Sequence, residues 1–153
     1  MKRQMNFVVG REKMAKISKK KREEVKNKFG GLCAYSGTPL EDDWQVDHLK
    51  PIVRNWWDGT CNFEKDHVED NMIPSQKLIN HYKSSMSLED FRDRMLTLHE
   101  RLASLPKNPR TERSVKRIRY LQRIGEYFGV TPNTPFDGVF YFEKNCNKVW
   151  YCE

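Results

Sequence analysis

The segment WQVDHLKPIV, residues 44–53, places two ionisable side chains at the end of an apolar run that is typical of a buried strand. Asp47 and His48 are adjacent, and a proline follows His48 three positions later. An imidazole titrates near neutral pH and can accept a proton from water. The two residues are therefore either a satisfied polar pair inside the fold or part of a reaction centre.

Further polar residues of the same kind follow downstream. Asn71 lies in DNMIP, residues 70–74, Asn80 follows nine positions later, and Lys83 comes three positions after that. Taken singly, Asn71 can be a turn residue and Asn80 a solvated helix position. Their interpretation depends on reading them together with the Asp-His pair.

With these segments the chain resembles the HNH endonucleases, also called ββα-metal nucleases, over roughly residues 17–100. The resemblance rests on DH at 47–48, DNMIP at 70–74 and NHYK at 80–83, with CAYSG at 33–37 similar to the family's C-x-x-C-G turn. KSSMSLEDFR at 83–92 is similar to a helix start that often follows, and FYFEK at 140–144 resembles the tail of some members more weakly.

The resemblance implies a role for each matching residue. His48 corresponds to the general base, and Asn71 to the residue that braces the loop so that His48 points correctly. Asp47 and Asn80 correspond to the ligands of one divalent cation, for which Mg²⁺ or Mn²⁺ suits a carboxylate and an amide oxygen. The implied function is a metal-dependent HNH-type DNA endonuclease, a phosphodiester hydrolase, and its role stays open among phage, mobile-element, restriction and repair enzymes.

Positive charge indicates a polyanionic partner. The 153 residues carry a formal net charge of +7, with 28 Lys and Arg against 21 Asp and Glu, and we expect double-stranded DNA. The expected DNA contacts are Lys50, Arg54, Lys83, Arg117 and Arg119. Trp56 and Trp57 either stack on bases or cap a small core. The alternative functions are a non-catalytic DNA-binding module and a basic protein-binding adaptor, and the oligomeric state stays open.

The chain departs from the family at its zinc-binding positions. Where two CxxC pairs are usual, it has Cys33-x-x-Ser36 and Gln76-x-x-Ile79. Three of four thiolates are missing, so we expect no structural zinc and expect packing by Ile79 to replace the cross-link. His67 and His81 are interpreted as bystanders.

No apolar run is long enough for a membrane span or a signal-peptide core, so we expect a cytoplasmic protein, in the host cytoplasm if phage-encoded. The length suits one domain. We expect an α+β fold in which a ββα-metal core, residues 17–104, follows a basic N-terminal arm, residues 1–16. Residues 105–153 would pack on this core as a basic helix and a β-hairpin.

Local signals place the expected elements. Ser18 should cap a helix reaching about Phe29, residues 44–49 should form a strand, and residues 75–82 a short helix. Ser87 with Asp90 predicts a capped helix whose apolar stripe runs to Leu102. A second long helix should span about residues 111–128 and end at Gly129, and a β-hairpin should close the chain with its turn at residues 145–147.

Overall fold

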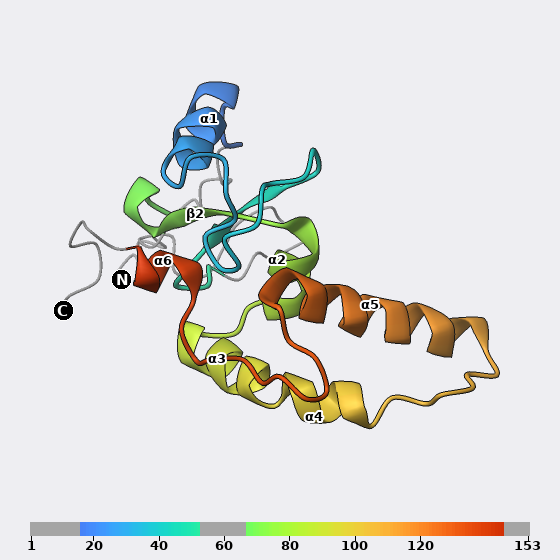
Figure 1. Cartoon of the computed structure of the whole chain (residues 1–153). Coiled ribbons are helices and arrows are strands. Elements are labelled where there is room, and N and C mark those ends of the chain that lie inside the picture. Colours follow the sequence, from blue (N-terminus) through green and yellow to red (C-terminus); the bar gives the residue numbers. More distant parts are fainter. Residues whose placement is uncertain (1–15, 53–66, 146–153) are drawn as a thin grey trace, which may run out of the picture.

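The computed structural model describes residues 16–52 and 67–145. At its centre lie two short antiparallel strands, β1 (Gln45–His48) and β2 (Met72–Ser75), and β2 leads directly into the helix α2 (Lys77–Lys83). Figure 1 shows these elements between α1 on one side and the later helices on the other. The fold is α+β, as expected, and the chain runs strand, strand, helix through its centre.

The small sheet is buried on both faces. Gln45 pairs with Ser75 and His48 pairs with Met72, and successive side chains point to opposite faces. Val46 and Met72 pack in a small apolar cluster with Val25 of α1 (Lys19–Asn27), whereas Ile73 belongs to the main core. Residues that are neighbours in β1 therefore face different surroundings.

The N-terminal helix α1 begins as expected, because the Ser18 side chain accepts the Lys21 N–H. The helix ends at Asn27, two residues before the expected end, and Gly30 and Gly31 follow with φ of 60° and 80°. These left-handed conformations suit glycine and reverse the chain. The turn at residues 32–39 then closes with a bridge between Leu32 and Pro39.

The expected long helix after Ser87 is two helices, α3 (Leu88–Leu96) and α4 (Leu98–Ala103). The helix breaks at Thr97, whose φ and ψ are −96° and 2° and whose hydroxyl donates to the Arg94 carbonyl. The Ser87 cap is confirmed, since its hydroxyl accepts the Asp90 N–H. Of the expected stripe, Leu88 is half-buried, and the other four residues are buried as their spacing predicts: Phe91, Met95, Leu98 and Leu102.

The second long helix, α5 (Glu112–Phe128), agrees closely with expectation. Thr111 caps its start by accepting the Ser114 N–H, and Gly129 ends it with φ of 65°. Its C-terminal half packs on the core through Leu121 and Ile124, and α5 contacts α4. Its N-terminal half extends away from the sheet together with the preceding loop (Figure 1).

The expected C-terminal β-hairpin is wrong in its first part, because residues 141–144 form a short helix, α6 (Tyr141–Lys144). The Glu143 carboxylate accepts the Phe140 N–H, which caps this turn, and Phe140 and Phe142 both insert into the main core. Alternating aromatic residues suggest a strand, but here Phe140 lies in extended backbone just before the helix and Phe142 lies in its single turn. The rest of the expected hairpin, residues 146–153, lies outside the described residues.

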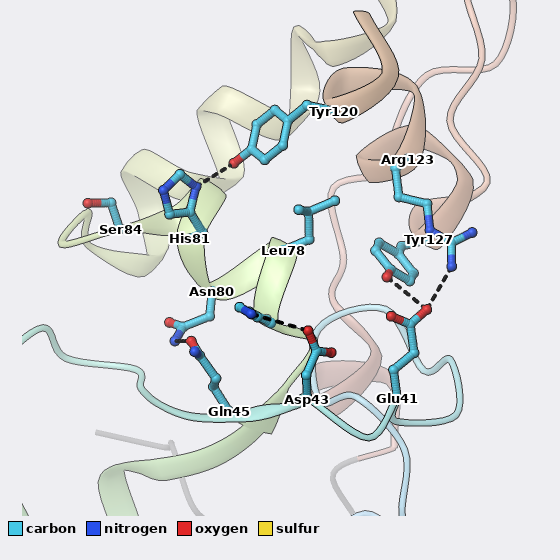
Figure 2. A pocket seen from close by; sticks show the side chains of 11 residues that line it. Glu41, Asp43, Gln45, Leu78, Asn80, His81, Ser84, Tyr120, Arg123 and Tyr127 are labelled. Atoms are coloured by element: carbon cyan, nitrogen blue, oxygen red, sulfur yellow. Dashed lines mark hydrogen bonds and ion pairs between the residues drawn. The ribbon is translucent and has the colours of Figure 1, made fainter. Parts of the chain in front are cut away.

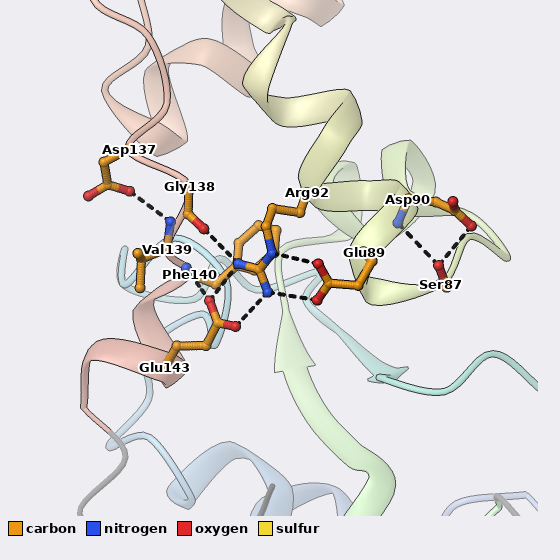
Figure 3. Close-up of polar contacts among 9 residues, drawn as sticks. All are labelled: Ser87, Glu89, Asp90, Arg92, Asp137, Gly138, Val139, Phe140 and Glu143. Carbon is orange, nitrogen blue, oxygen red and sulfur yellow. Dashed lines mark hydrogen bonds and ion pairs between the residues drawn. The ribbon is translucent and has the colours of Figure 1, made fainter. Parts of the chain in front are cut away.

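Arg92 of α3 fastens this segment to the rest of the core (Figure 3). Its guanidinium donates to both Glu143 oxygens, at 2.6 and 2.8 Å, and to the Gly138 carbonyl at 2.6 Å. Burial alone would raise the pKa of Glu143, but hydrogen bonds from Arg92 and the Phe140 N–H, with the charge of Arg92, hold that pKa below its usual range.

Over the two described ranges, no helix combines the length and apolarity needed to cross a bilayer.

Candidate active site

The adjacent residues Asp47 and His48 point to opposite faces of β1. Asp47 pairs with Ile73 and faces the main core, whereas His48 pairs with Met72 on the face toward α1. Both side chains are buried. The strand therefore brings the two residues together in sequence but gives each a different set of contacts.

The Asp47 carboxylate has three hydrogen-bond or ion-pair partners. Oδ2 accepts the Tyr35 hydroxyl at 2.6 Å and lies 3.3 Å from the Lys83 ammonium, while Oδ1 accepts the His48 N–H at 2.7 Å. Burial raises the pKa of Asp47 and outweighs the charge of Lys83 and these hydrogen bonds, which act to lower it. Tyr35 belongs to the turn segment CAYSG, so the tyrosine of that segment is also a site residue.

Lys83 occupies a different place from the one expected for a DNA contact. Its side chain is 0% exposed, and its ammonium donates to the His48 carbonyl at 3.0 Å in addition to its contact with Asp47. In this arrangement the charge of Lys83 is paired with Asp47 inside the protein. Only Lys50 of the expected contacts near β1 is exposed in the described residues, because Arg54, Trp56 and Trp57 lie outside them.

The imidazole of His48 lies against that of His67. Nε2 of His48 is 3.0 Å from Nδ1 of His67, and the rings stack with centroids 5.1 Å apart. His67 was expected to be a bystander, and the structure brings it to the proposed base. Its position four residues before Asn71, in HVEDN, is the only sequence signal that could have drawn attention to it.

Asn71 makes the kind of contact that bracing requires. It ends the single-turn helix η2 (Glu69–Asn71), and its Oδ1 accepts the Lys50 N–H at 2.8 Å while Nδ2 donates to the Lys50 carbonyl at 2.9 Å. Its own carbonyl accepts the Leu49 N–H at 3.1 Å. The two residues that follow His48 are thereby attached to the residue that precedes β2.

Asn80 lies on α2 at the edge of an open cleft of about 960 Å³ between β1, α2 and α5 (Figure 2). Its Nδ2 donates to Gln45 Oε1 at 2.8 Å. Across the cleft His81 bonds to the Tyr120 hydroxyl at 3.0 Å, and Glu41 accepts hydrogen bonds from Arg123 and Tyr127. The cleft thus combines neutral hydrogen-bonding groups with carboxylates that are already paired.

The expected metal ligands fit a hard divalent cation in their donor chemistry. Because Asn80 uses its amide nitrogen on Gln45, its amide oxygen is left without a donor from the described residues. Asp47 Oδ1 accepts a single N–H. Carboxylate and amide oxygens suit Mg²⁺ or Mn²⁺. Among residues 16–52 and 67–145 no three His, Cys, Asp or Glu side chains gather as a metal cluster. Asp47 and Asn80 are only two residues, and one of them is an asparagine, so they are not such a cluster.

At the four positions that correspond to zinc ligands, hydrogen bonds and core packing hold the neighbouring segments together. Gln76 is buried, and its Nε2 donates to Thr38 Oγ1 at 3.2 Å and to the Pro39 carbonyl at 2.7 Å. Its Oε1 accepts the Glu41 N–H at 3.1 Å. Ile79 is fully buried in the main core, and Ser36 shares a hydrogen bond with Thr38. Gln76 therefore ties the turn at 32–39 to the start of α2.

The expected DNA contacts of the C-terminal region lie on α5. Arg117 and Arg119 are exposed there, in the N-terminal half of the helix. They share this helix with Tyr120 and Arg123, which line the cleft beside Asn80. Helix α5 therefore carries both exposed basic side chains and one wall of the cleft.

Comparison of the chain with models of known protein families, with curated proteins and with solved structures finds no significant match.

Proposed function

We propose that the chain is an HNH-type endonuclease, which hydrolyses phosphodiester bonds of DNA with His48 as the general base. The observation that carries the proposal is the central strand-strand-helix unit. His48 ends β1, Asn71 attaches the following residues to the start of β2, and Asn80 lies on the helix that follows. This order and these contacts support the roles implied by the sequence resemblance.

His48 would take a proton from the attacking water at a ring nitrogen. The water oxygen forms a bond to phosphorus, the bond from phosphorus to the leaving oxygen breaks, and that oxygen takes a proton from solvent. Nε2 of His48 is in contact with His67, so a water that reacts at this nitrogen would take the place of His67. His67 then contributes to holding the ring in position before substrate binds.

A divalent cation would be held by Asp47 and Asn80, and when bound it supplies positive charge for the leaving oxygen. Other residues of the chain hold each of these two side chains in place. Tyr35 and Lys83 take Oδ2 of Asp47, and Gln45 takes the amide nitrogen of Asn80. Among the described residues, Oδ1 of Asp47 has fewer partners than Oδ2, and the amide oxygen of Asn80 has fewer than the amide nitrogen.

Double-stranded DNA would be held by exposed basic side chains on either side of this unit. Lys50 lies two residues after the proposed base, and Arg117 and Arg119 lie on α5. Contacts with phosphates position a duplex without reading its sequence.

A non-catalytic DNA-binding module is favoured by one observation. Asp47 and Lys83 form a buried pair that accounts for both charges without any reaction. The alternative and the proposed function differ in one assay, which incubates the protein with supercoiled plasmid and scores nicked and linear forms.

We expect cleavage with Mg²⁺ or Mn²⁺ and none with excess EDTA. Asp47→Ala and Asn80→Ala should each raise the Mg²⁺ concentration needed for activity. Binding of plasmid without cleavage under every metal condition would support the non-catalytic alternative, and cleavage that survives EDTA would contradict the metal requirement.

A further inference from the structure

We propose that Lys83 is a positioning residue, a buried cation that holds the end of β1 against α2 and keeps His48 in place. The inference rests on the proposed function for its catalytic consequence, but the contacts stand without it. The Lys83 ammonium is 3.0 Å from the His48 carbonyl oxygen and 3.3 Å from Asp47 Oδ2. Its side chain has no exposed surface.

A fully buried ammonium is costly unless it is paired and hydrogen-bonded. Lys83 meets both conditions, because Asp47 supplies the opposite charge and the His48 carbonyl a second acceptor. Asp47 is itself fixed by the Tyr35 hydroxyl. Lys83 thus joins three segments that are distant in sequence: the turn carrying Tyr35, the end of β1, and the last turn of α2.

The peptide between His48 and Leu49 is held at both of its polar groups. Its carbonyl accepts the Lys83 ammonium, and its N–H donates to the Asn71 carbonyl at 3.1 Å. Within the described residues β1 has a single neighbouring strand, and so short a two-stranded sheet is marginal by itself. Lys83 and Asn71 therefore fix the backbone of the proposed base from opposite sides.

This arrangement separates Lys83 from the exposed basic residues. A lysine that binds a DNA phosphate adds to affinity and to its salt dependence, whereas a buried positioning residue acts on the rate of the chemical step. Small displacements of a catalytic group lower rates on the order of 10²-fold. Removing the Lys83 charge should consequently lower kcat while DNA affinity is preserved.

Lys83→Met tests this by keeping most of the aliphatic stem and removing the ammonium, with Lys77→Met on the same helix as the control. Lys77 is exposed, and within the described ranges its ammonium pairs with Asp43. We expect Lys83→Met to shift the Leu49 amide resonance in a ¹H–¹⁵N spectrum and to lower kcat on the order of 10- to 100-fold. The dissociation constant for a DNA duplex and its salt dependence should match the parent, and Lys77→Met should leave the Leu49 resonance at its parent position.

Reductive methylation of the unmodified protein, read by mass spectrometry, gives a second measurement that does not depend on a folded variant. Lys77 should be methylated in the native protein, and Lys83 only after unfolding in urea, with or without DNA. Methylation of native Lys83 that DNA prevents would overturn the proposal, as would a Lys83→Met variant with lower DNA affinity and a reduced salt slope.

Neither methylation nor the amide spectrum depends on cleavage. A protein that cleaves no DNA under any condition would contradict the proposed function, and these two measurements would still decide whether Lys83 holds the His48–Leu49 peptide.

Discussion

The side chain of Asn71 binds the main chain of Lys50 at both of its polar groups. Oδ1 accepts the Lys50 N–H at 2.8 Å, and Nδ2 donates to the Lys50 carbonyl at 2.9 Å. These two hydrogen bonds join the start and the end of the segment between β1 and β2, next to the proposed base. A side-chain amide offers one acceptor and two donors, so no other residue type of this size satisfies both groups of one residue.

Asn71→Ala should lower the free energy of unfolding by about 1–3 kcal/mol, because two hydrogen bonds of about 1 kcal/mol each are lost. Urea unfolding measures the loss, and plasmid cleavage should fall with it. Asn145→Ala is the matched control, since Asn145 makes one exposed hydrogen bond to the Tyr141 carbonyl. Equal stability of both variants would show that the contact with Lys50 contributes little.

His48→Ala should leave the fold and DNA binding nearly intact and lower the cleavage rate by roughly 10²-fold or more, the usual contribution of a general base. Single-turnover cleavage of plasmid measures the rate. His81→Ala provides the comparison, because His81 lies beside Asn80 but bonds to Tyr120 on the cleft wall. Undiminished cleavage by the His48 variant would exclude His48 as the base.

Gln76→Ala should destabilise the protein by about 2–3 kcal/mol, since three hydrogen bonds are lost, two to the turn at 32–39 and one from the Glu41 N–H. Thermal or urea unfolding measures the change. Gln122→Ala removes an exposed side chain of the same type and should be nearly neutral. Elemental analysis of the purified protein should find no stoichiometric zinc, and one zinc per chain would point to a different form of cross-link.

DNA affinity should fall steeply with salt, with a log–log slope of roughly −4 to −7 if about five to eight phosphates are neutralised. The double variant Arg117→Ala/Arg119→Ala should flatten this slope without changing the metal requirement. Fluorescence anisotropy with a labelled duplex measures both. Lys144→Ala is the control, because its ammonium is paired with Asp137. A double variant with the parent's slope would confine DNA contact to other parts of the chain.

Stability should fall as the pH is lowered from about 5 toward 3, because the pKa of Glu143 is held below its ordinary value of 4.5. In that window this carboxyl binds more protons in the unfolded chain than in the native protein, so its protonation favours unfolding. The stabilisation is fully present above the unfolded pKa and is lost through the folded pKa. Glu143→Gln should weaken this acid dependence in urea unfolding at successive pH values. An unchanged pH profile would show that the Arg92 contact does not favour the charged form.

Local signals in the sequence predicted much of the helical structure correctly. Ser18, Ser87 and Thr111 each accept a backbone N–H at the start of a helix, and Gly129 ends α5 in the left-handed conformation. Capping depends on residues within one turn of the helix end, so it can be read without knowing the fold. The strand Gln45–His48 lies within the expected range 44–49, whose apolar residues are Trp44, Val46 and Leu49.

Where local patterns predicted the wrong backbone conformation, non-local contacts determined the structure. The aromatic alternation at Phe140 and Phe142 suggested a strand, but the main core accepts both rings around a short helix. The apolar stripe after Ser87 suggested one helix, but the backbone breaks at Thr97 while the stripe stays buried. Periodicity reports which side chains are buried and does not report how the backbone bends to bury them.

By itself, the sequence determined the α+β class, the helix caps and the set of residues proposed for the site. The tertiary structure alone decided the partners of those residues: Lys83 with Asp47 inside the protein, His67 on His48, and Asn71 on Lys50. Lys83 and Asp47 are 36 positions apart, and whether a lysine reaches solvent or a buried carboxylate depends on how α2 packs on β1. Burial and pairing of a charge are properties of the packed chain, because both arise only when distant segments exclude water together.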